Sequence, residues 1–145
     1  MDLLTQYPAL PVLGVVYLIL VLKMIAVGSY TSSIRLRRGV YATPEDYELQ
    51  GRTPPALPDE DIERARRAHR NDLENILPFF GAALFYALTQ PSMFMTRVYF
   101  WGFCLARICH SVFYIRHRQP HRTIAFSVGL ILMVLMVLST LISLL

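Results

Sequence analysis

The stretch RRAHRNDLENILPFFGAALFYAL, residues 66–88, joins a dense group of charged residues directly to an apolar run. As a helix, the apolar part from residue 76 to 88 is about 20 Å long, which is shorter than a hydrocarbon core of about 30 Å. The helix must therefore include a turn or two of the polar part in order to cross a membrane. This requirement puts Arg70, Asn71 and Glu74 at or just inside the membrane boundary.

Three further apolar segments accompany this one, and 54% of the chain is hydrophobic. Long apolar blocks without two-residue alternation are typical of membrane-spanning helices, because only helices and closed barrels satisfy their backbone hydrogen bonds in lipid. We therefore predict an all-α integral membrane protein whose residues 1–145 form one domain, a bundle of four transmembrane helices. The predicted spans are residues 7–34, 60–89, 94–116 and 122–145, with a cytoplasmic loop at residues 35–58.

The basic residues gather near the first and third connections between these spans, whereas only Arg97 lies near the second. The positive-inside rule then puts the first and third connections in the cytoplasm and both termini on the opposite side. The net charge of +4 follows from this topology and does not indicate nucleic-acid binding. A bacterial inner membrane and an endoplasmic reticulum both fit the predicted orientation.

Helical spacing sorts the polar residues of the second span onto faces. Arg67, Arg70, Asn71 and Glu74 recur at i, i+3, i+4 and i+7, so they share one face. A charge that faces lipid costs several kcal/mol, which predicts that this face points to the bundle interior. Asp72 lies on another face, and we assign it to helix packing. The basic residues before Arg67 are explained by topology and contacts with lipid headgroups.

The third span has a similar polar stripe. Arg107, His110 and Tyr114 recur at i, i+3 and i+7, and we predict that they also face the bundle interior. Two interpretations of Arg107 are open: it contacts a ligand, or it forms a structural ion pair with Asp72 or Glu74. His110 and Tyr114 likewise have structural alternatives, as a hydrogen bond between helices and as part of an interfacial aromatic belt.

Polar residues of the other two spans lie at the same depth: Lys23 in the first, Arg35 at its exit, and Arg122 at the start of the fourth. The outer half of the bundle has almost none, which predicts a pocket open to the cytoplasm and not a channel or transporter. A small zwitterionic peptide fits such a pocket better than a simple phosphate, because Asn71 and Glu74 require an amide or a cation. If that peptide carries a thiol, an adjacent arginine favours the thiolate.

The predicted loop contains ATPEDYEL, residues 42–49, which has the pattern of a short helix. Thr43 suits the N-cap position, Pro44 the first helical position, and Asp46 lies three residues after the cap. Asp46 is therefore either a capping acid or a functional residue. The acids from Asp59 onward suit the start of the second long helix, where they meet the positive end of the helix dipole.

Sites of other kinds have little support. The four histidines lack a close set of ligands and no cysteine pair accompanies them, so no metal site is predicted. There is no glycine-rich phosphate loop and no serine-histidine-acid pattern. Cys104 and Cys109 lie in an apolar segment and are interpreted as small buried residues.

Four stretches carry a family resemblance: ERARRAHRNDLENILPF (63–79), ATPEDY (42–47), ARICHSVFY (106–114) and QPHRT (119–123). They resemble the membrane-associated proteins in eicosanoid and glutathione metabolism, in the branch of the microsomal glutathione transferases and the microsomal prostaglandin E synthases. The resemblance covers nearly the whole chain, and the order of the motifs matches the four-helix layout of the family.

The resemblance implies a homotrimer that binds glutathione at subunit interfaces near the cytoplasmic side. Arg122 matches the arginine proposed to stabilise the thiolate, and Asp46 matches an acid proposed for prostaglandin isomerisation. The residues that match glutathione-contacting positions are Arg35, Arg67, Arg70, Asn71, Glu74, His110, Tyr114 and Arg122.

Two positions depart from the prostaglandin synthase pattern. Thr123 stands where that pattern has serine, and Phe126 stands where it has tyrosine. The stretch QPHR, with phenylalanine following at position 126, is closer to the glutathione transferase type. We therefore predict a membrane glutathione transferase with Arg122, Thr123 and Asp46 as candidate catalytic residues. Its expected partners are glutathione, membrane lipids, and hydrophobic electrophiles or lipid hydroperoxides. The alternatives are a glutathione-dependent prostaglandin E synthase and a non-catalytic lipid-binding scaffold of the same superfamily.

Overall fold

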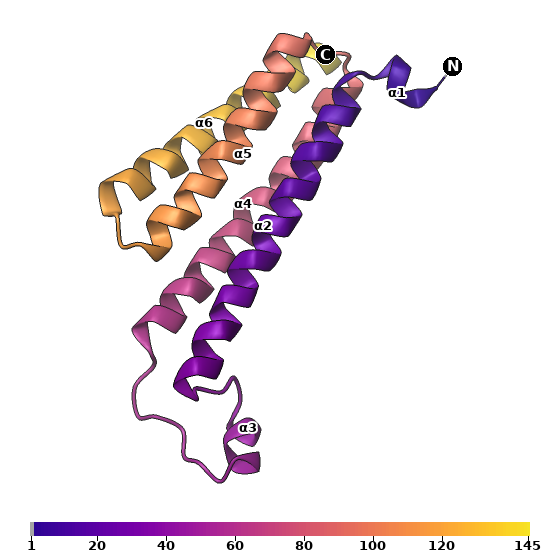
Figure 1. Ribbon diagram of the computed structural model, residues 1–145. Coiled ribbons are helices and arrows are strands. Elements are labelled where there is room, and N and C mark those ends of the chain that lie inside the picture. Colours follow the sequence, from indigo (N-terminus) through magenta and orange to yellow (C-terminus); the bar gives the residue numbers. More distant parts are fainter. Residues whose placement is uncertain (1) are drawn as a thin grey trace.

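The computed structural model describes residues 2–145 and contains helices but no strand within that range. Residue 1, which belongs to the predicted domain, lies outside the described residues. The prediction of an all-α chain is confirmed. The helices are α1 (Leu3–Gln6), α2 (Ala9–Arg38), α3 (Pro44–Leu49), α4 (Glu60–Leu88), α5 (Met93–Ile115) and α6 (Gln119–Leu144). Figure 1 shows α2, α4, α5 and α6 running alongside one another, with α3 in the loop beyond the end of α2.

Three of the described helices, α2, α5 and α6, are long and apolar enough to cross a membrane. This agrees with the predicted integral membrane class. α4 does not meet the same criterion of composition, because its first half carries the charged residues between Glu60 and Glu74. A fourth span in α4 therefore stays a prediction.

Local signals explain where the long helices begin and end. Asp59 caps α4, and its Oδ1 accepts hydrogen bonds from the backbone nitrogens of Asp61 and Ile62 at 3.0 and 3.2 Å. α2 ends at Gly39, whose φ of 63° is the left-handed conformation that glycine adopts without strain. The predicted short helix is present as α3, with Thr43 at the N-cap and Pro44 at its first position, although Thr43 makes no capping hydrogen bond through its side chain.

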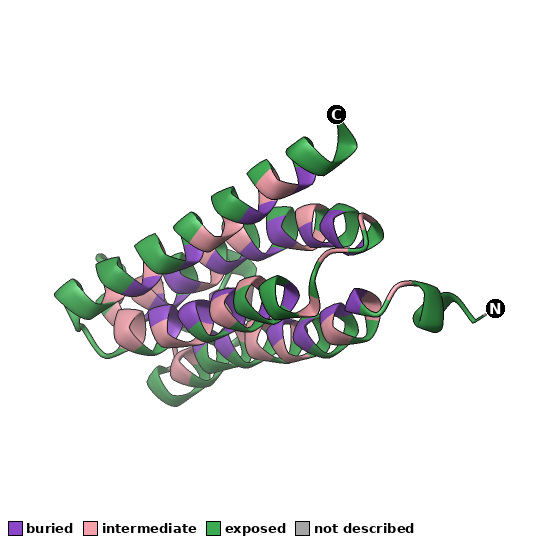
Figure 2. Cartoon of the chain, turned by 90° about the horizontal axis from the view of Figure 1, so that it is seen from above, coloured by how far each residue is buried: buried purple, intermediate pink, exposed green. Residues whose placement is uncertain are grey.

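α4 and α5 form the centre of the bundle, since each packs against all three other long helices. Aromatic rings fill much of the space between these two helices. Phe79 and Phe103 stack with centroids 3.9 Å apart, and Phe100 meets Phe79 edge-on at 6.0 Å. Figure 2 shows buried residues along the inward faces of the helices and exposed residues on the outward faces. Many of the exposed residues are large and apolar, as expected for a surface that faces lipid.

Candidate functional site

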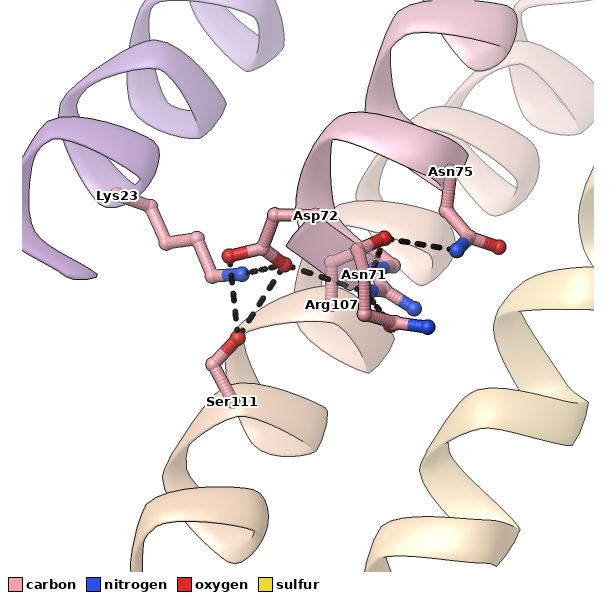
Figure 3. Close-up of polar contacts among 6 residues, drawn as sticks. All are labelled: Lys23, Asn71, Asp72, Asn75, Arg107 and Ser111. Carbon is pink, nitrogen blue, oxygen red and sulfur yellow. Dashed lines mark hydrogen bonds and ion pairs between the residues drawn. The ribbon is translucent and has the colours of Figure 1, made fainter. Parts of the chain in front are cut away.

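A cluster of buried charges joins three helices in the half of the bundle nearest α3. Asp72 of α4 is fully buried, and its Oδ1 accepts hydrogen bonds from the ammonium of Lys23 on α2 and from Nη2 of Arg107 on α5, the latter at 3.1 Å. The hydroxyl of Ser111, also on α5, lies 3.3 Å from the same oxygen. Figure 3 shows the three donors converging on the carboxylate.

This cluster decides two of the predictions. Arg107 is a member of a structural ion pair, and its partner is Asp72 and not Glu74. The assignment of Asp72 to helix packing is confirmed, because its carboxylate links α2, α4 and α5. The residue that sequence reasoning missed is Ser111, although its position four residues after Arg107 could have put it on the same face of α5.

The cluster extends to Asn71 through Arg107. Nη2 of Arg107 donates a hydrogen bond to Oδ1 of Asn71 at 2.6 Å. The backbone carbonyl of Asn71 accepts a hydrogen bond from Nδ2 of Asn75 at 2.8 Å. The half-buried Asn71 thus lies at the border between the buried cluster and the outward face of α4.

Three of the predicted ligand contacts come together between α5 and α6. His110 is buried and its ring centroid lies 5.5 Å from that of Tyr114. The guanidinium carbon of Arg122, in the first turn of α6, lies 4.6 Å from the centroid of the Tyr114 ring. Nδ1 of His110 is buried and has no hydrogen-bond partner among the described residues. These residues confirm that the polar stripe of the third span begins inside the bundle.

The prediction that the polar stripe of the second span also faces the interior is wrong for three of its members. Arg67, Arg70 and Glu74 are exposed in the structure, and the side chains of Arg70 and Glu74 are 72% and 60% exposed. Asp72 occupies the inward face instead. Residues two positions away from Asp72 lie roughly 200° around the helix, so Arg70 and Glu74 must point outward.

A groove of about 410 Å³ lies between α2 and α4 on this outward side. Arg35 and Arg70, two of the predicted ligand contacts, both line it, together with Arg66 and His69. Nε of Arg35 and Nδ1 of His69 are buried there without a hydrogen-bond partner among residues 2–145. The groove is strongly cationic and suits an anionic group.

The two remaining candidates lie apart from these clusters. Asp46 is half-buried on α3 and takes part in no ion pair within the described residues. Thr123 is exposed on the first turn of α6, where its hydroxyl donates to the carbonyl of Gln119 at 3.4 Å. Neither residue therefore joins the cluster of His110, Tyr114 and Arg122 by a polar contact that the structure shows.

Residues 13–142 match the MAPEG family. The chain belongs to the MAPEG family. This match spans nearly the whole helical bundle, including every residue of the clusters described above. It also confirms the resemblance that the sequence motifs indicated.

Among the relatives of this MAPEG chain are enzymes of two kinds. Prostaglandin E synthase of Equus caballus is 39% identical over 122 residues, which cover 83% of this chain and 80% of the relative. Prostaglandin E synthase of Homo sapiens is 35% identical over 129 residues, covering 88% and 85%. Microsomal glutathione S-transferase 1 of Rattus norvegicus is 42% identical over 116 residues, covering 77% and 75%. The identities alone do not separate the two activities.

Proposed function

We propose that this MAPEG protein is an integral-membrane glutathione transferase that conjugates hydrophobic electrophiles. The observation that carries the proposal is the meeting of His110, Tyr114 and Arg122 between α5 and α6, with a buried imidazole nitrogen left without a partner. Relatives named as glutathione transferases support the choice of glutathione.

The residues of the chain suit the groups that glutathione carries. Its carboxylates match the cationic side chains of Arg35, Arg67 and Arg70, and its ammonium group matches Glu74. Its peptide groups match the amide of Asn71 and the free Nδ1 of His110. Nε of Arg35 and Nδ1 of His110, which lack hydrogen-bond partners among the described residues, support a polar ligand.

Arg122 is the residue that we assign to the chemical step. It lies in the first turn of α6, where the guanidinium charge adds to the positive end of the helix dipole. Both favour an anion beside them, so a thiol held there is present as thiolate at a lower pH. The ring of Tyr114 supports the guanidinium from one side. Bound glutathione supplies the sulfur nucleophile, and Arg122 keeps it in the reactive ionised form.

The electrophile reaches the site through the bilayer in this proposal. The outward surface of the bundle is apolar over most of its length, which allows a hydrophobic molecule to approach from lipid. We assign four spans to α2, α4, α5 and α6, with α3 and the site on the cytoplasmic side. The same topology fits a bacterial inner membrane or an endoplasmic reticulum. Reduction of lipid hydroperoxides by the same thiolate is a companion activity.

A homotrimer with sites at the subunit interfaces completes the proposal. Arg67, Arg70 and Glu74 are exposed on the protomer, yet in the proposed topology Arg70 and Glu74 lie at or just inside the membrane boundary. Charges that face lipid are costly, so a second copy of the chain covering this face removes that cost. The second copy also encloses the ligand, because the binding site on a single protomer is open.

The second candidate is a glutathione-dependent prostaglandin E synthase, which relatives of that name favour. Against it stand Thr123 in place of serine and Phe126 in place of tyrosine. The Phe126 ring centroid lies 5.9 Å from that of His110, so the hydroxyl that a tyrosine would carry is absent beside the site. A non-catalytic scaffold is a third possibility, and it requires that glutathione does not bind.

The test is conjugation of an aromatic halide by purified protein. Arg122→Ala is expected to lower the rate of conjugation about 10²-fold, because a positioned positive charge is removed from the reacting anion. Arg118→Ala, which changes an exposed arginine one turn earlier, is the matched control and should leave the rate unchanged. Equal rates for both variants would remove Arg122 from the mechanism.

Two further measurements separate the alternatives. Product analysis with a prostaglandin endoperoxide distinguishes an isomerase from a transferase, and Thr123→Ala should then matter more for isomerisation than for conjugation. Calorimetry with glutathione tests the scaffold hypothesis, because a non-catalytic scaffold that does not bind glutathione should give no heat of binding.

A further inference from the structure

The buried charge cluster ends on a residue of the proposed glutathione site. One nitrogen of Arg107, Nη2, donates to the carboxylate of Asp72 at 3.1 Å and to Oδ1 of Asn71 at 2.6 Å. A guanidinium has only donors, so the oxygen and not the nitrogen of the Asn71 amide must face it. The orientation of the amide is thereby determined, and its NH₂ group is turned away from Arg107. Figure 3 shows this nitrogen on the side of Asn71 that faces away from Asp72.

The guanidinium is itself held in place. Asp72 is 0% exposed and the side chain of Arg107 is 1% exposed, so neither charge can leave its partner without remaining buried and unpaired. Lys23 from α2 binds the same carboxylate. The ion pairs of Asp72 therefore connect α2, α4 and α5, and Asn71 is attached to the outer end of this connection.

Asn71 is not required to neutralise these charges. Asp72 already has two cationic partners, Lys23 and Arg107, so the bond to Asn71 adds nothing to the balance of charge. Its effect is on Asn71, whose backbone carbonyl is also occupied, by Asn75. What remains free is the NH₂ group of Asn71, which makes no side-chain hydrogen bond to any group of residues 2–145. A fixed amide with a free donor suits the binding of a carbonyl or carboxylate oxygen.

We propose that Asp72 and Arg107 are positioning residues of the glutathione site, which hold the Asn71 amide so that its NH₂ group donates to an oxygen of the bound tripeptide. This inference rests on the proposed function, because it takes glutathione as the ligand. Asp72 and Arg107 do not touch the ligand themselves. Lys23 supports the arrangement from α2 by partly neutralising the carboxylate.

The charges of the cluster suggest a variant that keeps its net charge. Lys23, Arg107 and Asp72 together carry a net charge of +1, that is, two positive charges and one negative. The double substitution Lys23→Met and Asp72→Asn also leaves +1, on Arg107 alone. Methionine matches much of the lysine stem and asparagine has the shape of aspartate, so the packing is preserved. The charge-assisted bond that holds Arg107 is lost.

The experiment is a double-mutant cycle on the full-length protein, read by calorimetric titration with glutathione. Asn71→Ala is one arm, Lys23→Met with Asp72→Asn is the other, and the combination closes the cycle. Each arm should weaken glutathione binding about tenfold, as expected for the loss of one hydrogen bond to a charged or well-positioned group. The combination should bind no more weakly than Asn71→Ala alone, because the cluster acts through Asn71.

Ser111→Ala is the matched control for this cycle. It removes a buried hydroxyl from Asp72 but touches neither Arg107 nor Asn71 through a hydrogen bond. It should leave glutathione affinity within about twofold of the wild-type value. If the cluster has only a structural role, Ser111→Ala and the charge-preserving variant should both weaken glutathione binding, because both disturb the same packing.

A second variant guards against failure of the first to fold. Arg107→Lys keeps a positive charge beside Asp72 but removes the guanidinium that holds the amide, and it can replace the double substitution in the same cycle. If the two arms add in full, Asp72 and Arg107 do not act through Asn71, and the inference is overturned while glutathione binding stands. If the wild-type protein binds no glutathione, the proposed function itself fails.

Discussion

The two faces of α4 hold charged side chains in opposite environments at the same depth. On the inward face, Asp72 is fully buried and has cationic partners on α2 and α5. On the outward face, Arg70 and Glu74 are 72% and 60% exposed, and their charged atoms are 3.9 Å apart. These residues are neighbours in the sequence, so the difference comes only from the direction in which each side chain points.

This difference separates residues that build the protein from residues that we propose for ligand binding. A buried charge beside its counter-charges contributes to the fold, and removing one partner leaves an uncompensated charge inside. An exposed pair at 3.9 Å contributes little, because holding two long side chains in one geometry costs conformational entropy. The outward residues are thus free to exchange their weak mutual contact for contacts with a ligand or a second subunit.

The largest effect is expected when the inward face is broken. Asp72→Asn leaves Lys23 and Arg107 as two buried cations without a carboxylate, and we expect it to lower the free energy of unfolding by about 3–5 kcal/mol. Adding Lys23→Met should recover part of this loss, because one unpaired charge is removed. Thermal unfolding of the detergent-solubilised protein, followed by circular dichroism, measures both changes.

The control for this prediction is an exposed ion pair on the same helix. Glu63→Gln breaks the pair with Arg66, whose charged atoms are 2.7 Å apart, and the change should stay within about 0.5 kcal/mol. Equal losses of stability for Asp72→Asn and Glu63→Gln would contradict the distinction between the two faces.

A smaller effect, and one of a different kind, is expected on the outward face. Glu74→Gln keeps the size of the side chain and removes its charge, so it should weaken glutathione binding about tenfold through loss of one charge-assisted contact. The melting temperature should not change, because the side chain is mostly exposed. Calorimetry and thermal unfolding of the same preparation test both statements. A large fall in melting temperature with unchanged affinity would put Glu74 with the structural residues.

The smallest effect concerns pH and the exposed start of α4. The guanidinium of Arg38 donates to both oxygens of Asp59 at 2.6 Å and holds the pKa of that carboxyl below its usual value. A carboxyl whose pKa is lowered by folding stabilises the protein above its unfolded pKa, and this contribution is lost as the pH falls through the folded pKa. Acidification should therefore weaken the connection between the ends of α2 and α4.

Asp59→Asn isolates the charge in this prediction. Asparagine caps helices about as well as aspartate, so the backbone bonds of the cap are kept while the ion pair with Arg38 is removed. The melting temperature of the variant should depend less on pH in the acid range than that of the wild-type protein. Parallel curves for the two proteins would show that the Arg38 pair has no part in acid sensitivity.

Local rules were sufficient where a short segment decides its own structure. Asp59 and Pro44 indicated where α4 and α3 begin, because capping and proline geometry depend on neighbouring residues alone. The depth and spacing of the charged residues limited the predicted ion-pair partner of Arg107 to two acids, Asp72 and Glu74. The choice between Asp72 and Glu74 required the packing of α4 against α5, which spacing within one helix does not contain.

The orientation of the polar stripe on α4 shows the same limit more sharply. The spacing of Arg67, Arg70, Asn71 and Glu74 established that they share a face, and the cost of charge in lipid suggested that this face is internal. Asp72 also avoids that cost, because it forms ion pairs with Lys23 and Arg107 inside the bundle. Either polar face of α4 could point to the interior of the bundle. The face of Asp72 does so, because it has ion-pair partners on α2 and α5.

The sequence by itself determined the helical class of this protein, its membrane character and the family to which it belongs, because long apolar blocks and ordered motifs carry that information along the chain. Only the tertiary structure decided which charges are paired inside and which remain on the outward face. The physical reason is that a buried charge is stable only beside its counter-charge, and the counter-charges of Asp72 come from helices that lie far from it in the sequence.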